Sequence, residues 1–136
     1  MTDVDLAQLS PGDELPALAL PPISRATLAL FAGASGDHNP IHIDLDVARS
    51  AGMDDVFAHG MLSMAYLGRL LTNWVPQERI QSFTVRFLAI TPVHAQPTCT
   101  GVVRAVDGTT ATVDLAVRLA DGTTTLEGTA LITLED

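Results

Sequence analysis

A short polar segment, "GDHNPIHIDLD" at residues 36–46, holds most of the side chains in this sequence that could do chemistry. Asp37 and His42 lie five residues apart with Pro40 between them, so a loop bent at the proline would bring both side chains to one point. A carboxylate and an imidazole held together can share a water, one taking its proton while the other donates a proton to a substrate. Histidine suits this task because its ordinary pKa lies near neutral pH.

Two other interpretations of the segment stay open. The first is a plain turn, since Asp and Asn side chains cap their own backbone and proline fixes φ. The second is a metal site, but the spacing matches no zinc motif, no HExxH motif and no EF-hand loop, and we expect no metal. The candidate ligands would be Asp37, His38, His42, Asp44, Asp46 and His59.

The tripeptide His59-Gly60-Met61 opens the strongest predicted helix, about twenty residues after the polar segment. The first turn of a helix leaves amide groups unpaired, and these amides together with the helix dipole would stabilise a developing oxyanion. Gly60 would let a carbonyl approach closely, although an ordinary loop-to-helix junction also favours glycine. An acid–base pair beside an oxyanion hole indicates chemistry next to a carbonyl, with a thioester enolate as the natural intermediate.

The hydrophobic spacing predicts three helices around these residues, over 25–35, 46–49 and 59–75. Ser24 is the expected N-cap of the first helix, and Gly33 and Gly36 are expected to end it. Gly52 is expected to close the second helix. The third is apolar over most of its circumference, which predicts a buried helix that Pro76 stops.

The pattern then switches to alternating strands. We expect strands at 80–93, 98–107, 110–121 and 123–136, with an earlier short strand within 11–22. Asp107-Gly108 and Asp121-Gly122 predict hairpin turns, so the strands are antiparallel. Five strands with one dry face would wrap the long helix.

The bulk composition bounds the class of protein. The 136 residues fit one domain spanning 1–136, and 47% apolar residues predict a packed core. A net charge of −9 argues against nucleic acid or an anionic membrane as partner. No apolar run reaches the about 20 residues of a membrane span, and "MTDVDLAQLS" does not resemble a signal peptide, so we expect a cytoplasmic protein. The single cysteine, Cys99, is expected to be buried in a strand.

The segment "FAGASGDHNPIHIDLDVA" at 31–48 resembles the signature of the MaoC-like (R)-specific enoyl thioester hydratases. "AHGM" at 58–61 and "VRFLAITPV" at 85–93 are similar to two further parts of that family. The positions that carry the first motif are Ser35, Gly36, Asp37, Asn39, Pro40, Ile41, His42 and Ala48.

The resemblance implies an α+β hot dog fold that interconverts (2E)-enoyl and (3R)-3-hydroxyacyl thioesters of CoA or acyl carrier protein. Asp37 and His42 would be the catalytic pair, the Gly60 amide would bind the thioester oxygen, and Asn39 would help to hold the water or the pair. The family needs no metal or redox cofactor.

The family is usually dimeric, and its sites lie near the subunit interface. The segments at 58–75 and 83–93 are similar to the β subunit of the (3R)-hydroxyacyl-ACP dehydratases. We therefore expect a homodimer, or a heterodimer with a related hot dog subunit. A partner-dependent or non-catalytic acyl-thioester binder, and a hot dog thioesterase, remain alternatives.

Overall fold

The computed structural model describes residues 5–135. Residues 1–4, part of the segment compared with signal peptides, and residue 136, the last of the predicted final strand, lie outside this part. The helices are α1 (Arg25–Ser35), α2 (Leu45–Ser50) and α3 (Gly60–Thr72), with 3-10 turns η1 (Leu6–Gln8), η2 (Pro40–His42) and η3 (Gln77–Arg79). The strands are β1 (Leu18–Ala19), β2 (Ile80–Phe87), β3 (Thr98–Asp107), β4 (Thr110–Arg118) and β5 (Thr124–Thr133).

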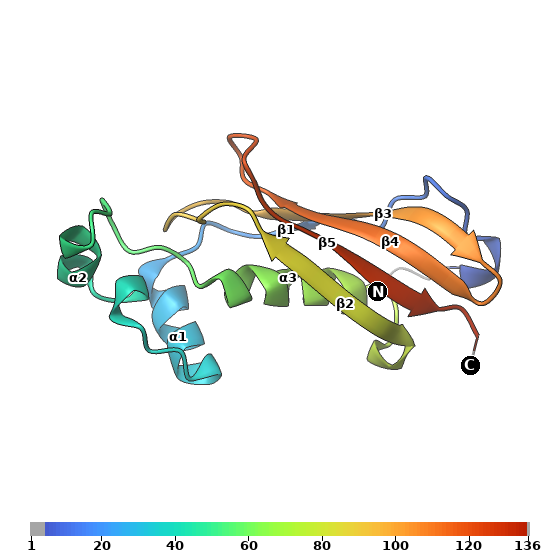
Figure 1. Cartoon of the computed structure of the whole chain (residues 1–136), viewed down its shortest axis with the longest axis horizontal. Coiled ribbons are helices and arrows are strands. Elements are labelled where there is room, and N and C mark those ends of the chain that lie inside the picture. The colour runs from blue at the N-terminus through green and yellow to red at the C-terminus, as the bar shows by residue number, and fades with distance from the viewer. Residues whose placement is uncertain (1–4, 136) are drawn as a thin grey trace.

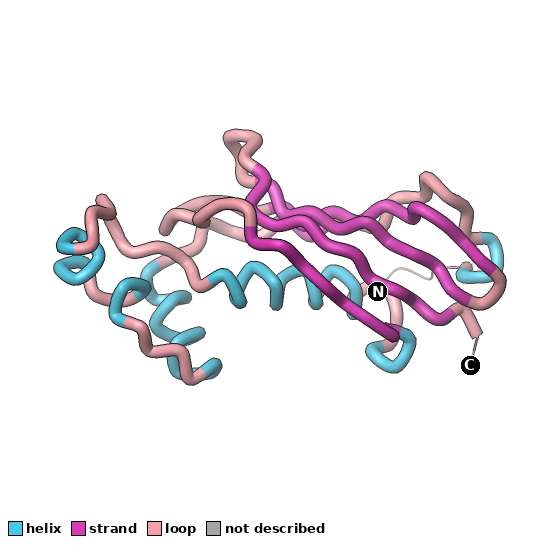
Figure 2. The backbone as a smooth tube through the Cα atoms, viewed as in Figure 1, coloured by secondary structure: helices cyan, strands magenta, loops and turns pink. Residues whose placement is uncertain are grey.

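The five strands form one antiparallel sheet, as the sequence predicted, and the structure gives their order as β1-β3-β4-β5-β2. Asp107 pairs with Thr110 across the β3–β4 turn, where Gly108 has a φ of 58°. Gly122 has a φ of 92° in the β4–β5 turn. Both values lie in the left-handed region that glycine adopts without steric cost, which confirms the two predicted turns. The sheet lies along one side of α3 (Figures 1 and 2).

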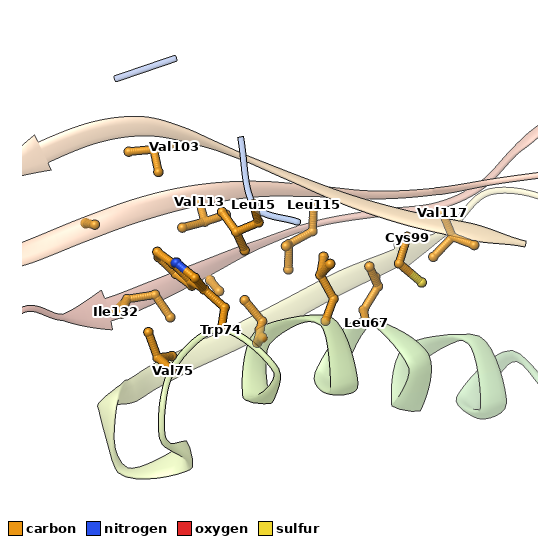
Figure 3. Close-up of a cluster of buried hydrophobic side chains, with 14 of the residues drawn as sticks. Leu15, Leu67, Trp74, Val75, Cys99, Val103, Val113, Leu115, Val117 and Ile132 are labelled. Atoms are coloured by element: carbon orange, nitrogen blue, oxygen red, sulfur yellow. The ribbon is translucent and has the colours of Figure 1, made fainter. Parts of the chain in front are cut away.

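The main core lies between α3 and the inner face of the sheet (Figure 3). Leu67, Leu70 and Leu71 of α3 are at most 1% exposed. Each such side chain contributes about 1.5–3 kcal/mol on burial. Their partners include Leu15, Trp74, Cys99, Val103, Val113, Leu115, Val117, Leu126 and Ile132. Cys99 is fully buried there, as predicted.

A second apolar cluster joins α1 and α2 to the start of α3. Leu28 of α1, Ala48 of α2 and Leu62 of α3 are buried in it. Figure 1 shows α1 and α2 near the N-terminal end of α3, beyond the sheet. The Oγ of Ser24 accepts a hydrogen bond from the Thr27 amide, so the predicted N-cap of α1 is confirmed. This cluster fixes the loop between α1 and α2 beside the start of α3.

The end of α1 differs in part from the prediction. Gly36 ends the helix with a φ of 79°, and its N–H donates to the Ala32 carbonyl oxygen at 3.0 Å. Gly33, however, lies inside α1. Only the position that needs a left-handed backbone terminates the helix, while an exposed glycine with ordinary helical dihedrals merely weakens it.

Strands β2, β4 and β5 are shorter than predicted, whereas β3 has the predicted bounds. Strand β2 ends at Phe87 rather than at residue 93, because the amides of Leu88 and Ala89 both donate to the Thr125 carbonyl, which breaks the regular ladder. The chain then leaves the sheet and passes residue 57, where Phe57 and Pro92 form an isolated bridge. Strands β4 and β5 end at residues 118 and 133, before the predicted limits of 121 and 136.

Helix α3 is not buried all round, and it ends at Thr72 rather than at residue 75. Met61 is 54% exposed, and Ala65 is also exposed. A single sheet covers only one side of a helix, so the opposite apolar strip stays open in this chain. No helix within residues 5–135 has the length and apolar character needed to cross a membrane.

Candidate active site

The loop after α1 is shaped by its own polar side chains. The Asp37 amide donates to Ser35 Oγ at 3.2 Å, and the Asn39 amide donates to Asp37 Oδ1 at 3.2 Å. Asn39 Oδ1 in turn accepts from the Ile41 amide at 3.1 Å and caps the short turn η2, which begins at Pro40. The turn interpretation of this segment is therefore correct, and it does not compete with a site, because the same turn orients the side chains around it.

His42 is anchored at the end of η2. Its side chain is largely buried at 9% exposure, and its Nδ1 lies 2.8 Å from the Phe57 carbonyl oxygen. Because a carbonyl oxygen only accepts, Nδ1 carries the hydrogen of this bond. The phenyl ring of Phe57 also meets the imidazole edge to face, with centroids 5.0 Å apart. The Nε2 atom of His42 is then the nitrogen left to exchange protons.

The structure brings Asp37 and His42 together, and it adds His59. One ligand atom from each of these three side chains lies within 4.8 Å of the other two. Asp37 is exposed, whereas His42 and His59 are buried. A separation up to this value leaves room for one water that hydrogen bonds to both members of the predicted pair. The sequence placed His59 among the metal candidates, at the start of the predicted helix and within "AHGM", but it gave the side chain no part in the acid–base chemistry.

The geometry of the histidines does not favour a shared metal ion. The rings of His42 and His59 stack with centroids 4.0 Å apart and planes inclined by 28°. Nitrogen lone pairs lie in the ring plane, so the lone pairs of two stacked rings lie in nearly parallel planes rather than converging on one point. Of the other metal candidates, His38 and Asp46 are exposed, and Asp44 caps α2 by accepting from the amides of residues 46 and 47.

The start of α3 lies directly beside this group. His59 is its N-cap residue and gives no side-chain capping bond to the first turn. The amides at this end are therefore not satisfied by the cap side chain, and they carry the positive end of the helix dipole. A Cβ atom placed on Gly60 would lie 2.9 Å from Cε1 of Phe87. The absence of a side chain at residue 60 keeps the backbone open to a ligand beside that ring.

Two hollows meet the site. A mostly apolar pocket of about 450 Å³ has Asp37 at its wall and is lined along α3 by Met64 and Gly68 and across from it by Phe83. A second pocket, of about 340 Å³, contains Gly60 and the segment from residue 87 to 91. The larger hollow on the outer face of the sheet touches none of the site residues.

The role expected for Asn39, holding the water or the pair, stays a prediction. The contact that the structure gives to its side chain is the cap on the Ile41 amide. Phe57 was not identified from the sequence at all, since it acts through its backbone carbonyl, a group that every residue carries.

A protein-family model described as the MaoC like domain matches residues 8–125 of the sequence. The chain therefore belongs to the MaoC-like domain family. Among curated proteins, the (R)-specific enoyl-CoA hydratase of Rhodospirillum rubrum is 39% identical over 54 residues, which cover 40% of this chain and 38% of that protein. The chain spans less than half the length of the curated relatives it matches.

Solved structures agree with this assignment. An (R)-hydratase from A. caviae involved in PHA biosynthesis is 25% identical, with a TM-score of 0.84 over 94% of this chain and 98% of that one. The hot dog fold predicted from the sequence is thereby confirmed. The HadBC (3R-hydroxyacyl-ACP dehydratase) complex of Mycobacterium tuberculosis is 13% identical with a TM-score of 0.70, covering 90% of this chain and 96% of that one. That likeness shows the fold alone, so the assignment to the β-subunit branch stays a prediction.

Proposed function

We propose that this chain adds water to (2E)-enoyl thioesters, and removes it from (3R)-3-hydroxyacyl thioesters, by acid–base catalysis. The observation that carries this proposal is the approach of the Asp37 carboxylate to the His42 ring, within 4.8 Å, at the wall of an apolar pocket. Membership of the MaoC-like family and the named hydratases among its relatives support the same reaction.

In the hydration direction, Asp37 takes a proton from the shared water, and the water oxygen forms its bond to Cβ of the enoyl group. Electrons of the double bond move onto the thioester oxygen as an enolate. His42, in its protonated form, then donates a proton from Nε2 to Cα, which collapses the enolate. The bond from Nδ1 to the Phe57 carbonyl is kept throughout, because Nδ1 donates in both charge states of the ring.

The enolate oxygen needs stabilisation, and we place it at the amide of Gly60. This amide opens α3, a helix of 13 residues, and has the helix dipole behind it. Gly60 lines the smaller hollow and its neighbour Met61 lines the apolar pocket, which supports an extended substrate lying across the start of α3. The acyl chain would enter the apolar pocket along Met64 and Gly68, and the carrier arm, of CoA or acyl carrier protein, would leave past Phe87.

The test is the loss of enoyl-thioester absorbance with crotonyl-CoA and a long-chain enoyl-CoA, followed by chiral analysis of the product. We expect the (3R) alcohol. Asp37→Asn should lower kcat by about 10²–10⁴-fold. Asp46→Asn, which removes an exposed carboxylate from α2, is the matched control and should leave kcat unchanged. Near-native turnover by Asp37→Asn would overturn the mechanism.

Further measurements with the same substrates separate hydration from the thioesterase, binding and partner-dependent alternatives. A hot dog thioesterase would release a free thiol, which a thiol reagent detects, whereas hydration leaves the thioester intact. A binding subunit would bind acyl-CoA without turnover by the pure chain. Turnover that appears only after a co-purified partner is added would assign a partner-dependent role.

We also propose that the chain works as a dimer with itself or with a related hot dog subunit. Within residues 5–135, β2 lies at the edge of the sheet and pairs only with β5. Phe87, Leu88 and Ile90, at and after its end, are 53%, 47% and 50% exposed, and Met61 on the open strip of α3 is 54% exposed. Exposed apolar groups beside a free strand edge are typical of an interface. Light scattering on the pure chain tests this proposal, and a monomer would assign the surface to a different subunit.

A further inference from the structure

We propose that His59 is a positioning residue, which holds Asp37 and His42 at the separation that catalysis needs. The inference rests on the proposed hydratase function, but it concerns a side chain that the proposed chemistry does not use. His59 is 1% exposed, lies outside both proton-transfer steps, and nevertheless contacts both members of the pair by different means.

The contact with Asp37 is a long-range hydrogen bond. The Nε2 atom of His59 lies 3.1 Å from the main-chain carbonyl oxygen of Asp37, 22 residues earlier. Since that oxygen only accepts, Nε2 must carry the hydrogen. The bond ties the loop after α1 to the first residues of α3, and it acts on the backbone at the very residue whose carboxylate meets the water.

The contact with His42 is a ring stack. The two imidazoles face each other with centroids 4.0 Å apart and an angle of 28°. Phe57 meets the His42 ring edge to face at 5.0 Å, and Phe31 meets the His59 ring in the same way at 5.0 Å. The His42 side chain therefore cannot rotate without displacing the ring of Phe57 or of His59. Its Nε2 keeps one direction relative to the Asp37 loop.

The unused nitrogen of His59 supports a role in geometry rather than in proton transfer. With the hydrogen on Nε2, Nδ1 is a bare acceptor, and it is buried without a partner among residues 5–135. A buried polar atom without a partner is costly, so a residue chosen for packing alone would be apolar here. The hydrogen bond from Nε2 of His59 to the Asp37 carbonyl oxygen explains why an imidazole occupies the position.

Three variants test the inference by separating the two contacts. His59→Phe keeps a flat ring against His42 but removes the donor to Asp37. His59→Gln keeps an amide donor and removes the ring. His38→Gln is the matched control, because it makes the same change at an exposed histidine next to Asp37. All three are compared for kcat, KM, melting temperature and the pH profile of kcat.

We expect His59→Phe and His59→Gln each to lower kcat by about 10- to 10²-fold with little change in KM, because a misplacement near 1 Å costs that much. The pH profile should shift in both, since the surroundings of His42 change, and His38→Gln should match the wild type. The inference fails if both variants keep kcat within about threefold of wild type, or lose it only in proportion to the folded fraction.

A readout without turnover keeps this inference distinct from the proposed function. The Nδ1–H of His42, buried in its bond to Phe57, should give a slowly exchanging imidazole signal in nuclear magnetic resonance spectra. We expect this signal to shift and to exchange faster in both His59 variants. If wild type has no hydratase activity but this change is seen, the positioning role stands and the proposed reaction falls. An unchanged signal in both folded variants overturns the positioning role.

Discussion

The Nδ1 atom of His42 lies 2.8 Å from the carbonyl oxygen of Phe57, a residue 15 positions later in the chain. This bond joins the turn after α1 to the segment that leads into α3. It also selects the ring nitrogen that can work, because the atom that donates to a carbonyl is not free to exchange its proton with a substrate.

His42→Asn should keep the hydrogen bond to the Phe57 carbonyl while removing the nitrogen proposed to transfer a proton. The shorter amide keeps a donor near the position of Nδ1, so the bond to Phe57 can persist while Nε2 is lost. We expect kcat to fall by about 10²–10⁴-fold. The melting temperature should stay closer to wild type than that of His42→Ala, which leaves the Phe57 carbonyl without its partner. Substantial hydration by His42→Asn would show that Nε2 has no catalytic part.

Gly60→Ala should block the approach of the thioester oxygen. The added Cβ would lie 2.9 Å from Cε1 of Phe87 and would occupy the space beside the proposed oxyanion donor. We expect kcat to fall by about 10²–10³-fold, the effect of losing one such donor. The double variant Gly60→Ala/Phe87→Ala removes the ring atom that the Cβ meets. Recovery in the double variant would trace the loss to the clash with the ring, whereas a persistent loss supports the oxyanion role.

Gly68→Leu should shorten the apolar pocket. Gly68 lies on the open strip of α3 in the pocket wall, and a Cβ atom there would be 3.9 Å from Cε1 of Phe83, so a larger side chain has room to enter the hollow. We expect kcat/KM for a long-chain enoyl-CoA to fall by about tenfold or more relative to crotonyl-CoA. Gly33→Leu, at an exposed helix position with no atom within 4 Å of its Cβ, is the control. An unchanged ratio would place the acyl chain elsewhere.

Cys99 should make stability fall at alkaline pH. Burial raises the pKa of its thiol from 9.0 to about 12, so above pH 9 the unfolded chain loses a proton that the folded chain keeps. The contribution is complete below pH 9.0 and is lost as the pH rises toward about 12. Between pH 8 and pH 10.5, the free energy of unfolding in urea should drop by about 2 kcal/mol more in wild type than in Cys99→Ala. Equal drops in the two proteins would contradict this assignment.

Local features of the fold were readable from the sequence. Ser24 caps α1, Gly36 ends it, and Gly108 forms the β3–β4 turn, because each depends on the backbone and side chain of a few neighbouring residues. The end of β2 at Phe87 was not readable, since it depends on where the Thr125 carbonyl lies in the partner strand. Likewise, the pattern of α3 could not reveal that one sheet covers only part of its apolar surface.

The candidate pair shows the same division. The spacing of Asp37 and His42 around a proline predicted their approach, and the short range of that loop is the reason the prediction succeeded. The roles of the pair and of Gly60 and Asn39, and a single domain over 1–136, remain predictions. The contacts of His59 were not predicted, because they join residues far apart in the sequence. Its ring stacks on that of His42, 17 positions earlier, and its Nε2 donates to the main-chain oxygen of Asp37, 22 positions earlier.

The sequence by itself determined which groups are present, where the β-hairpin turns and the N-cap of α1 lie, and that the chain resembles one family of hydratases. Tertiary structure decided which nitrogen of His42 stays available for proton transfer, which histidine ring stacks on it, and which strip of α3 borders an open pocket. The physical reason is the range of the interactions. Caps and turns are set within a few residues, whereas a stacked ring, a carbonyl partner and an uncovered helix face exist only after distant segments have packed together.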